Sequence, residues 1–264
     1  MTSVVNRRRQ GFSLAELVVV IALATVVSMA LYRTLVFQQR FYRQQGAVNS
    51  TQDALRLAWS VVAADLLEAN PGAGDFGFVA AESVQVRSPV GFAMICDTNR
   101  SERVLGLFNV QGRVTNAPGD SLLIYDKAGW LVRRIEADNT TGGGSLSCPY
   151  AAGPSMAKRI RVDGPVDSVR VGTPIRAFHR YTYKLERDGD SWWLARADAS
   201  GTDILAGPFS GGGSGLVFTY FDSVGQTTTN AADVARVDLT LVAVSKLASA
   251  KRDSLGISAS PRNQ

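Results

Sequence analysis

Apolar residues in the first seventy positions follow two patterns in succession. Residues 12–31 are almost wholly apolar, and about 20 such residues in a helix cross the hydrocarbon core of a bilayer. Further on, apolar residues recur at steps of three, four and seven, which predicts an amphipathic helix. They are Val48, Leu55, Ala58, Val62, Leu66 and Ala69. We therefore expect one long helix with a transmembrane half over 12–36 and an amphipathic half over 37–70, ended by Asn70-Pro71.

The remaining chain has short alternating or β-branched runs between turn residues, which is typical of β-strands. The predicted strands are Ser83–Ile95, Arg103–Val110, Leu122–Tyr125, Trp130–Ile135, His179–Arg187, Ser191–Ala197, Leu216–Asp222 and Val234–Val244. Asp188-Gly189 is a strong hairpin-turn dipeptide. The fold class is therefore α+β, with the N-terminal helix packed on an antiparallel β-rich domain over 71–253 and a C-terminal tail over 254–264.

Two segments rich in small and polar residues interrupt the predicted strands. Residues 138–156 are rich in Gly, Ser, Thr and Pro, and Gly211–Gly215 is almost all glycine. Neither precedes a helix with a Lys-Ser/Thr signature, so neither is a phosphate-binding loop. Both are predicted to be loops.

Positive charge is concentrated before the apolar run. Arg7, Arg8 and Arg9 precede it, and no comparable cluster follows. The positive-inside rule then places the N-terminus in the cytoplasm and the β-rich domain outside the inner membrane. Without residues 1–11 the chain has 25 basic and 23 acidic residues, a balance that does not favour nucleic-acid binding.

Glu16 places a carboxylate inside the apolar run. An acidic group within a membrane segment is costly unless it is paired. Two interpretations remain open at this point. Glu16 lies shallow enough to stay hydrated among the headgroups, or a partner supplies a cation to it.

Cys96 and Cys148 are the two cysteines. In an exported chain such a pair favours a disulfide, worth roughly 4 kcal/mol in the loop-entropy model; two unpaired buried thiols are the alternative. With a single histidine, the chain lacks the ligands of an ordinary zinc site. Asp188 and Asp190 flank the predicted turn, which explains them better than weak calcium binding does. We expect no metal and no cofactor.

The sequence offers little support for catalysis. His179 lies on a predicted strand between Phe178 and Arg180, where a lone histidine is more often structural. No Gly-x-Ser-x-Gly motif occurs. Carboxylate pairs remain open, because aspartates are scattered through the predicted loops. We expect that the chain is not an enzyme.

The stretch Gly11-Phe12-Ser13-Leu14-Ala15-Glu16, with arginines before it and the apolar run after it, resembles the type III signal sequence of type IV pilins and pseudopilins. The resemblance implies that a prepilin peptidase removes residues 1–11 as a leader, cutting between Gly11 and Phe12, and methylates Phe12. It also implies that Glu16, then the fifth mature residue, sets assembly register by pairing with the Phe12 amine of a neighbouring subunit.

The sequence is compatible with two other fates of the N-terminus. Ser28-Met29-Ala30 has the small residues that an ordinary signal peptidase prefers, which predicts a mature start at Leu31. The apolar core is longer than is usual for such a signal peptide, and Glu16 then has no role. An unprocessed signal-anchor is the third possibility. Either alternative implies a membrane-tethered or secreted β-domain with a binding or hydrolytic role.

A looser resemblance covers residues 181–241. Tyr181–Glu186, Trp192-Trp193, Ile204–Gly207, Leu216–Asp222 and Val234–Leu241 are similar in order and type to J-type minor pseudopilins of type II secretion and W-type minor pilins. Segment 138–176 departs from that pattern. The resemblance implies a minor subunit that primes or tips a type IV pilus or a type II secretion pseudopilus. Its expected partners are prepilin peptidase, other minor subunits, the major subunit and the inner membrane.

Overall fold

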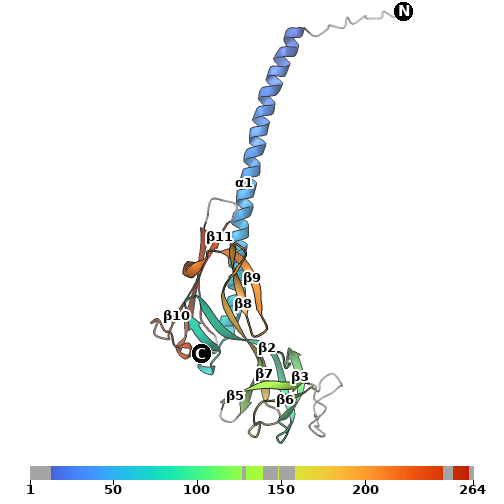
Figure 1. Ribbon diagram of the computed structural model, residues 1–264, viewed down its shortest axis with the longest axis vertical. Coiled ribbons are helices and arrows are strands. Elements are labelled where there is room, and N and C mark those ends of the chain that lie inside the picture. The colour runs from blue at the N-terminus through green and yellow to red at the C-terminus, as the bar shows by residue number, and fades with distance from the viewer. Residues whose placement is uncertain (1–12, 127–128, 139–147, 149–157, 246–251, 262–264) are drawn as a thin grey trace, which may run out of the picture.

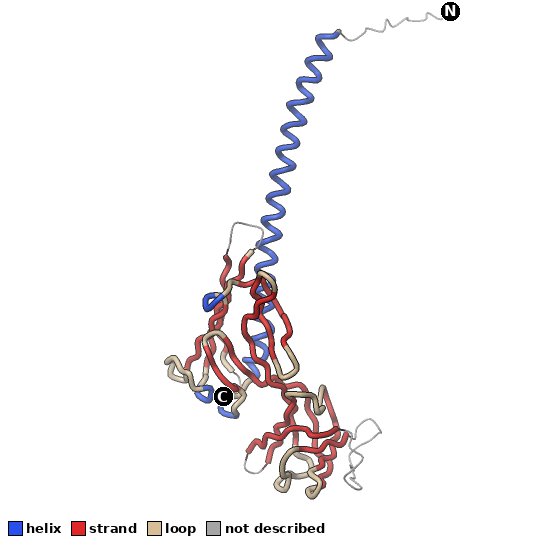
Figure 2. Tube along the Cα trace, in the orientation of Figure 1, coloured by secondary structure: helices blue, strands red, loops and turns tan. Residues whose placement is uncertain are grey.

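The chain forms one long helix followed by antiparallel β-structure, as its patterns predict (Figures 1 and 2). The computed structural model describes residues 13–126, 129–138, 148, 158–245 and 252–261. Helix α1, Leu14–Glu68, is continuous over 55 residues, a length of about 82 Å at 1.5 Å per residue. The expected α+β class is confirmed.

The strands that follow α1 pair antiparallel throughout the described residues. They are β1 Phe76–Ala80, β2 Ser83–Asn99, β3 Val104–Gly112, β4 Asp120–Asp126, β5 Gly129–Asp138, β6 Lys158–Val162, β7 Pro174–Asp188, β8 Ser191–Ala197, β9 Thr202–Phe209, β10 Leu216–Phe221, β11 Arg236–Val244 and β12 Arg252–Ala259. Three short 3-10 helices accompany them: η1 Pro71–Ala73, η2 Gly212–Ser214 and η3 Ala231–Asp233.

Helix α1 has two halves with opposite environments. All side chains over residues 13–35 are exposed, whereas the second half buries an apolar stripe. The buried residues are Ala47, Thr51, Ala54, Leu55, Ala58, Val62, Ala63 and Leu66. The predicted stripe is confirmed at Leu55, Ala58, Val62 and Leu66. These side chains pack against β2, β9, β11 and β12.

The β-structure contains two hydrophobic cores. The first lies against α1 and includes residues from β1, β2 and β7 to β12; we name this part the helix-packed subdomain. The second is formed by residues of β2 to β7 and of the loops between them. The sequence predicts one globular domain over 71–253, so the two cores are a departure from that prediction.

The second core is enclosed by a ring of six strands. Each strand pairs with the next in the order β2, β3, β6, β5, β4 and β7, and β7 pairs back to β2. We name this closed ring the distal barrel, because it lies beyond the C-terminal end of α1 (Figure 1). Closure leaves these strands without a free edge, which removes a site of unwanted strand pairing.

The long strands β2 and β7 run through both subdomains. Val84 of β2 and Tyr183 of β7 belong to the first core, and Ile95 and Ile175 of the same strands belong to the second. Their pairing register shifts between Pro89 and Gly91, a bulge that bends the strand between the two cores.

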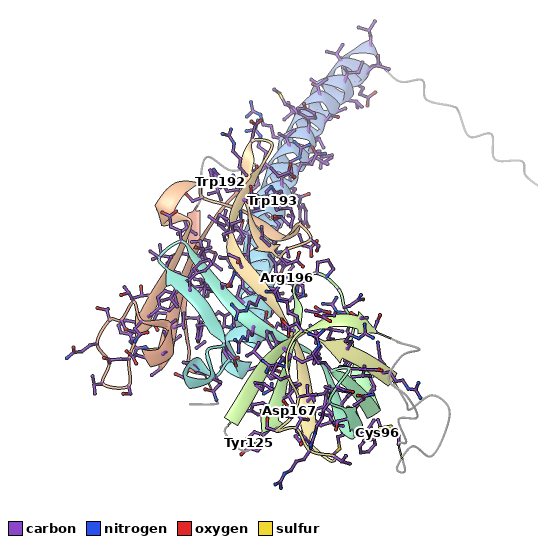
Figure 3. The ribbon with its side chains drawn as sticks, turned by 60° about the horizontal axis from the view of Figure 1, so that its bottom comes forward. Cys96, Tyr125, Asp167, Trp192, Trp193 and Arg196 are labelled. Carbon is purple, nitrogen blue, oxygen red and sulfur yellow. A yellow bond between two sulfur atoms is a disulfide. The ribbon has the colours of Figure 1, made fainter. Side chains whose placement is uncertain are left out.

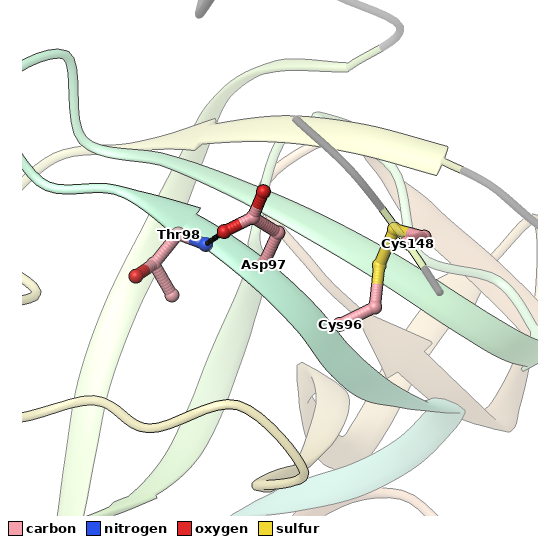
Figure 4. Close-up of a disulfide and its surroundings, with 4 residues drawn as sticks. All are labelled: Cys96, Asp97, Thr98 and Cys148. Atoms are coloured by element: carbon pink, nitrogen blue, oxygen red, sulfur yellow. Dashed lines mark hydrogen bonds between the residues drawn. A yellow bond between two sulfur atoms is a disulfide. The ribbon is translucent and has the colours of Figure 1, made fainter. Parts of the chain in front are cut away.

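The disulfide expected between Cys96 and Cys148 is confirmed (Figure 4). Cys96 is buried in β2 and the two Cα atoms lie 4.9 Å apart. The bond therefore ties residue 148 to the distal barrel. The predicted loop 138–156 otherwise lies largely outside the described residues, and part of segment 138–176 forms β6.

The C-terminal tail expected over 254–264 needs correction. Residues 252–259 form β12, which pairs with all but the first residue of β11. Its Ser- and Gly-rich composition gives it a low β-propensity. It forms a strand because it pairs with β11. Strands β1, β6 and β9 were likewise not predicted.

His179 links the two subdomains at their junction. Its Nδ1 lies 2.6 Å from Oδ1 of Asp120 in β4, and its Nε2 lies 2.9 Å from Oδ2 of Asp198, after β8. Asp120 also accepts a hydrogen bond from Arg113 at 2.9 Å. Hydrogen bonds from Ser200 hold the pKa of the Asp198 carboxyl below its ordinary value. One aspartate therefore lies at each ring nitrogen of His179. The structural role expected for His179 agrees with this arrangement.

Replacing His179 by alanine should destabilise the fold by about 3 kcal/mol, because it removes the imidazole that contacts the buried Asp120 carboxylate. Lys184→Ala is the matched control on the same strand, since it breaks an exposed ion pair with Glu186 and should cost less than about 1 kcal/mol. Denaturant unfolding of the two variants measures the difference. Equal losses of unfolding free energy in the two variants would show that the His179 contacts stabilise the fold no more than an exposed ion pair does.

Candidate processing and assembly site

The candidate site lies at the N-terminal end of α1. Arg7, Arg8, Arg9, Gly11 and Phe12, named from the sequence as the leader cluster, the cleavage bond and the methylated residue, lie outside the described residues. Ser13 and Glu16 are the first residues of the predicted motif whose geometry the structure gives.

Ser13 and Glu16 form a reciprocal cap on α1. The Glu16 N–H donates to Oγ of Ser13 at 3.2 Å, and the Ser13 N–H donates to Oε2 of Glu16 at 3.1 Å. This capping box satisfies two backbone donors that the helix itself leaves unpaired. A carboxylate in the first turn is also favoured by the positive end of the helix dipole.

Ser13 was not singled out from the sequence, although its signal was present. Ser13-Leu14-Ala15-Glu16 has the Ser-x-x-Glu spacing of a capping box before an apolar run. Glu16 consequently has a local role that neither interpretation from charge alone included. Both residues are exposed, so capping leaves the carboxylate accessible to a cation from outside the chain.

The first half of α1 presents apolar side chains in all directions. They include Leu14, Leu17, Val18, Val19, Val20, Ile21, Leu23, Val26, Val27, Met29 and Leu31, each more than half exposed. Among the described residues this is the one helix long and apolar enough to cross a membrane. A helix that is apolar on every side requires lipid or other apolar helices around it.

The other candidate residues lie in the β-structure, away from the N-terminal end of α1. Cys96 and Cys148 are in the distal barrel, and His179 is at the junction of the subdomains. Within the described ranges, no group of three His, Cys, Asp or Glu side chains is arranged to hold a metal ion. The chemistry of the N-terminal site is therefore that of its motif: a capped helix, one carboxylate and an apolar surface.

Trp192 and Trp193 are adjacent on β8, and strand alternation predicts one ring in the core and one outside. Both are half-buried instead, and Trp193 lies beside Ala47, Ser50 and Thr51 of α1 (Figure 3). The pairing register of β8 with β9 shifts between Trp192 and Leu194, and such an irregularity disturbs strict alternation.

Comparison with known proteins gives one family match. Residues 6–32 match the prokaryotic N-terminal methylation motif. The comparisons with curated proteins and with solved structures found no match. The matched residues include the predicted cleavage bond, Glu16 and the apolar run.

The match lies on the same residues as the capping box and the exposed apolar helix. A long helix that leads into a β-rich domain follows it. Together these features indicate a type IV pilin-like or pseudopilin-like protein, of the kind that prepilin peptidase processes and that assembles with other pilins in a membrane.

Proposed function

We propose that this chain is a minor pilin or pseudopilin that primes or tips a type IV pilus or a type II secretion pseudopilus. Its precursor is cut between Gly11 and Phe12, and Phe12 is methylated. The first half of α1 anchors it in the inner membrane with the N-terminus in the cytoplasm and the β-rich subdomains outside. Its role is structural, without a catalytic step of its own.

The observation that carries the proposal is the position of the distal barrel. The helix-packed subdomain covers the second half of α1, but the barrel extends beyond the end of that helix (Figure 1). When subunits stack along their N-terminal helices, such a projection occupies space where the next subunit's globular part is needed. A place at the end of the filament avoids that conflict. The resemblance of residues 181–241 to J-type and W-type minor subunits favours the same position.

The motif also accounts for lateral assembly. A freed α-amine is mostly cationic at neutral pH, so the Phe12 amine of one subunit and the Glu16 carboxylate of another neutralise each other in lipid. The apolar side chains of the first half of α1 then pack against neighbouring helices. Glu16 in this proposal sets the axial register.

The alternative function, a tethered or secreted β-domain that binds or hydrolyses a ligand, requires a different N-terminus. It predicts a mature start at Leu31 or an intact Met1.

Mass spectrometry of the mature N-terminus distinguishes these outcomes. We expect N-methylated Phe12 in cells that have prepilin peptidase and the full leader in cells that lack it. A start at Leu31, or an unprocessed chain in both strains, would overturn the pilin assignment.

Glu16→Ala should leave cleavage intact and reduce incorporation into filaments by at least about tenfold, the effect of losing roughly 1.4 kcal/mol or more of pairing. The assay is immunoblotting of sheared filaments against the membrane fraction. Ser13→Ala is the matched control: it removes the same cap, at a cost of about 1 kcal/mol, but keeps the carboxylate. Equal loss of incorporation in both variants would assign the effect to capping rather than to register.

Gold labelling of a C-terminal epitope tag tests the terminal position. We expect label at one end of each sheared filament, because the distal barrel obstructs further stacking there. The major subunit, tagged in the same way, supplies the control and should be labelled along the shaft. Label along the shaft in both strains would contradict the tip role.

A further inference from the structure

The β4–β5 hairpin of the distal barrel carries apolar side chains on both faces near its turn. Its inward side chains, such as Leu122 and Ile124, are fully buried in the barrel core. On its outward face the cross-strand pairs are Ser121 with Arg134, Leu123 with Val132, and Tyr125 with Trp130. An antiparallel sheet with one solvated face normally carries polar residues there. Leu123 is buried, but Val132, Tyr125 and Trp130 are exposed, and this apolar patch requires an explanation beyond folding.

Two aromatic rings form the outer end of this face. Tyr125 and Trp130 are 51% and 44% exposed, and their ring centroids lie 5.3 Å apart at an interplanar angle of 71°. Figure 3 shows Tyr125 at the end of the barrel that points away from α1. Each ring supports the other in an edge-to-face contact, so the pair forms a preorganised, solvent-exposed platform.

The inner end of the same face opens into a cleft of about 850 Å³ between the barrel and the turn at residues 197–199. Val132 and Arg134 belong to both the outward face and the cleft wall. Most other side chains around the cleft are polar: Gln85, Ser121, Arg133, Asp163, Arg180 and Thr182. The aromatic platform and the polar cleft thus form one continuous surface, which we name the hairpin cleft.

Three arginines and three aspartates line the hairpin cleft, so its formal charge is balanced, and the exposed charges are mostly those of arginine. Asp120 and Asp198 also line it, but both face the ring of His179. Arg134 is 82% exposed and lies 4.0 Å from Asp163, and Arg180 is exposed. Residues 89–178, which include the barrel, carry 11 basic and 8 acidic residues. They contribute +3 to a chain that is nearly neutral without its first eleven residues, so the excess charge is concentrated in this region.

We propose that the hairpin cleft binds an acidic saccharide, with a uronic-acid unit as its recognised group. One face of a sugar ring presents C–H bonds, whose partial positive charge suits the negative face of the Trp130 or Tyr125 ring. A uronate carboxylate pairs with the guanidinium of Arg134 or Arg180 by charge-assisted hydrogen bonds. Gln85 and Thr182 supply groups that both donate to and accept from hydroxyls.

The position of the cleft fits a ligand outside the filament. The distal barrel, which forms one wall of the cleft, lies beyond the C-terminal end of α1 (Figure 1), so assembly through the apolar half of that helix leaves the cleft accessible. An apolar peptide partner fits less well, because the cleft wall beside the platform is mostly polar. This inference goes beyond the structural role proposed above and is tested separately from it.

The experiment is isothermal titration calorimetry of the full-length protein in detergent with a galacturonate hexasaccharide, at an ionic strength of about 0.15 M to screen distant charges. We expect saturable binding, and little with maltohexaose, which lacks the carboxylates. Trp130→Ala and Arg134→Ala should each weaken binding by about tenfold, and Trp130→Phe should retain most of it.

Two exposed residues of the same region provide matched controls. Arg170→Ala removes the same charge as Arg134→Ala, and Val171→Ala removes an exposed apolar side chain; neither lines the cleft. Each should change affinity less than about twofold, within the effect of remote surface substitutions. Equal loss with Arg170→Ala, equal binding of maltohexaose, preference for single-stranded DNA of the same charge, or no binding would each overturn the proposal. N-terminal processing is measured by mass spectrometry and filament incorporation by immunoblotting, so failure of the saccharide proposal can be distinguished from failure of the proposed structural role.

Discussion

The whole arrangement depends on a helix that water alone cannot accommodate. The first half of α1 exposes apolar side chains on every side, while the second half buries one stripe against β-strands. Burial of Leu55, Val62 and Leu66 contributes about 1.5–3 kcal/mol per side chain and anchors the helix-packed subdomain. No strand of the described chain covers residues 13–35. That half therefore requires apolar surroundings, either lipid or other apolar helices.

The distal barrel depends on the same β2 and β7 strands that cover α1. Because these strands belong to both cores, the barrel is joined to the helix-packed subdomain through continuous backbone pairing rather than through a flexible linker. The contacts of His179 with Asp120 and Asp198 add a side-chain link at the junction. A projection held in this way has a fixed direction relative to α1, which the proposed place at the end of a filament requires.

The sequence predicts the parts of this fold whose signals are local. The helix, its buried stripe and strand β8 follow from periodicity, and Ser191–Ala197 was predicted with the observed bounds. The missed strands lack that signal. Strand β9 contains Gly207-Pro208, which argues against a strand, and β6 is only five residues long with three cationic ones. The division into two cores depends on how β2 pairs with the distant β7, and the sequence of neither strand alone indicates that pairing.

The cleavage motif was recognisable because its function requires contiguous residues. The hairpin cleft was not, because its residues come from β2, β4, β5 and β7.

The proposed register role of Glu16 uses the same carboxylate as the helix cap. Its Oε2 accepts the Ser13 N–H within its own helix, while the proposed register role needs the same carboxylate for a neighbouring amine. A carboxylate has two oxygens and about four acceptor positions, and one backbone hydrogen bond uses only one of them. The cap also fixes the side chain over the helix end, which reduces the entropy lost when a cation arrives. The Ser13 N–H thus holds the carboxylate where the proposed intersubunit contact needs it, and because this donor is a backbone group, Ser13→Ala leaves it in place.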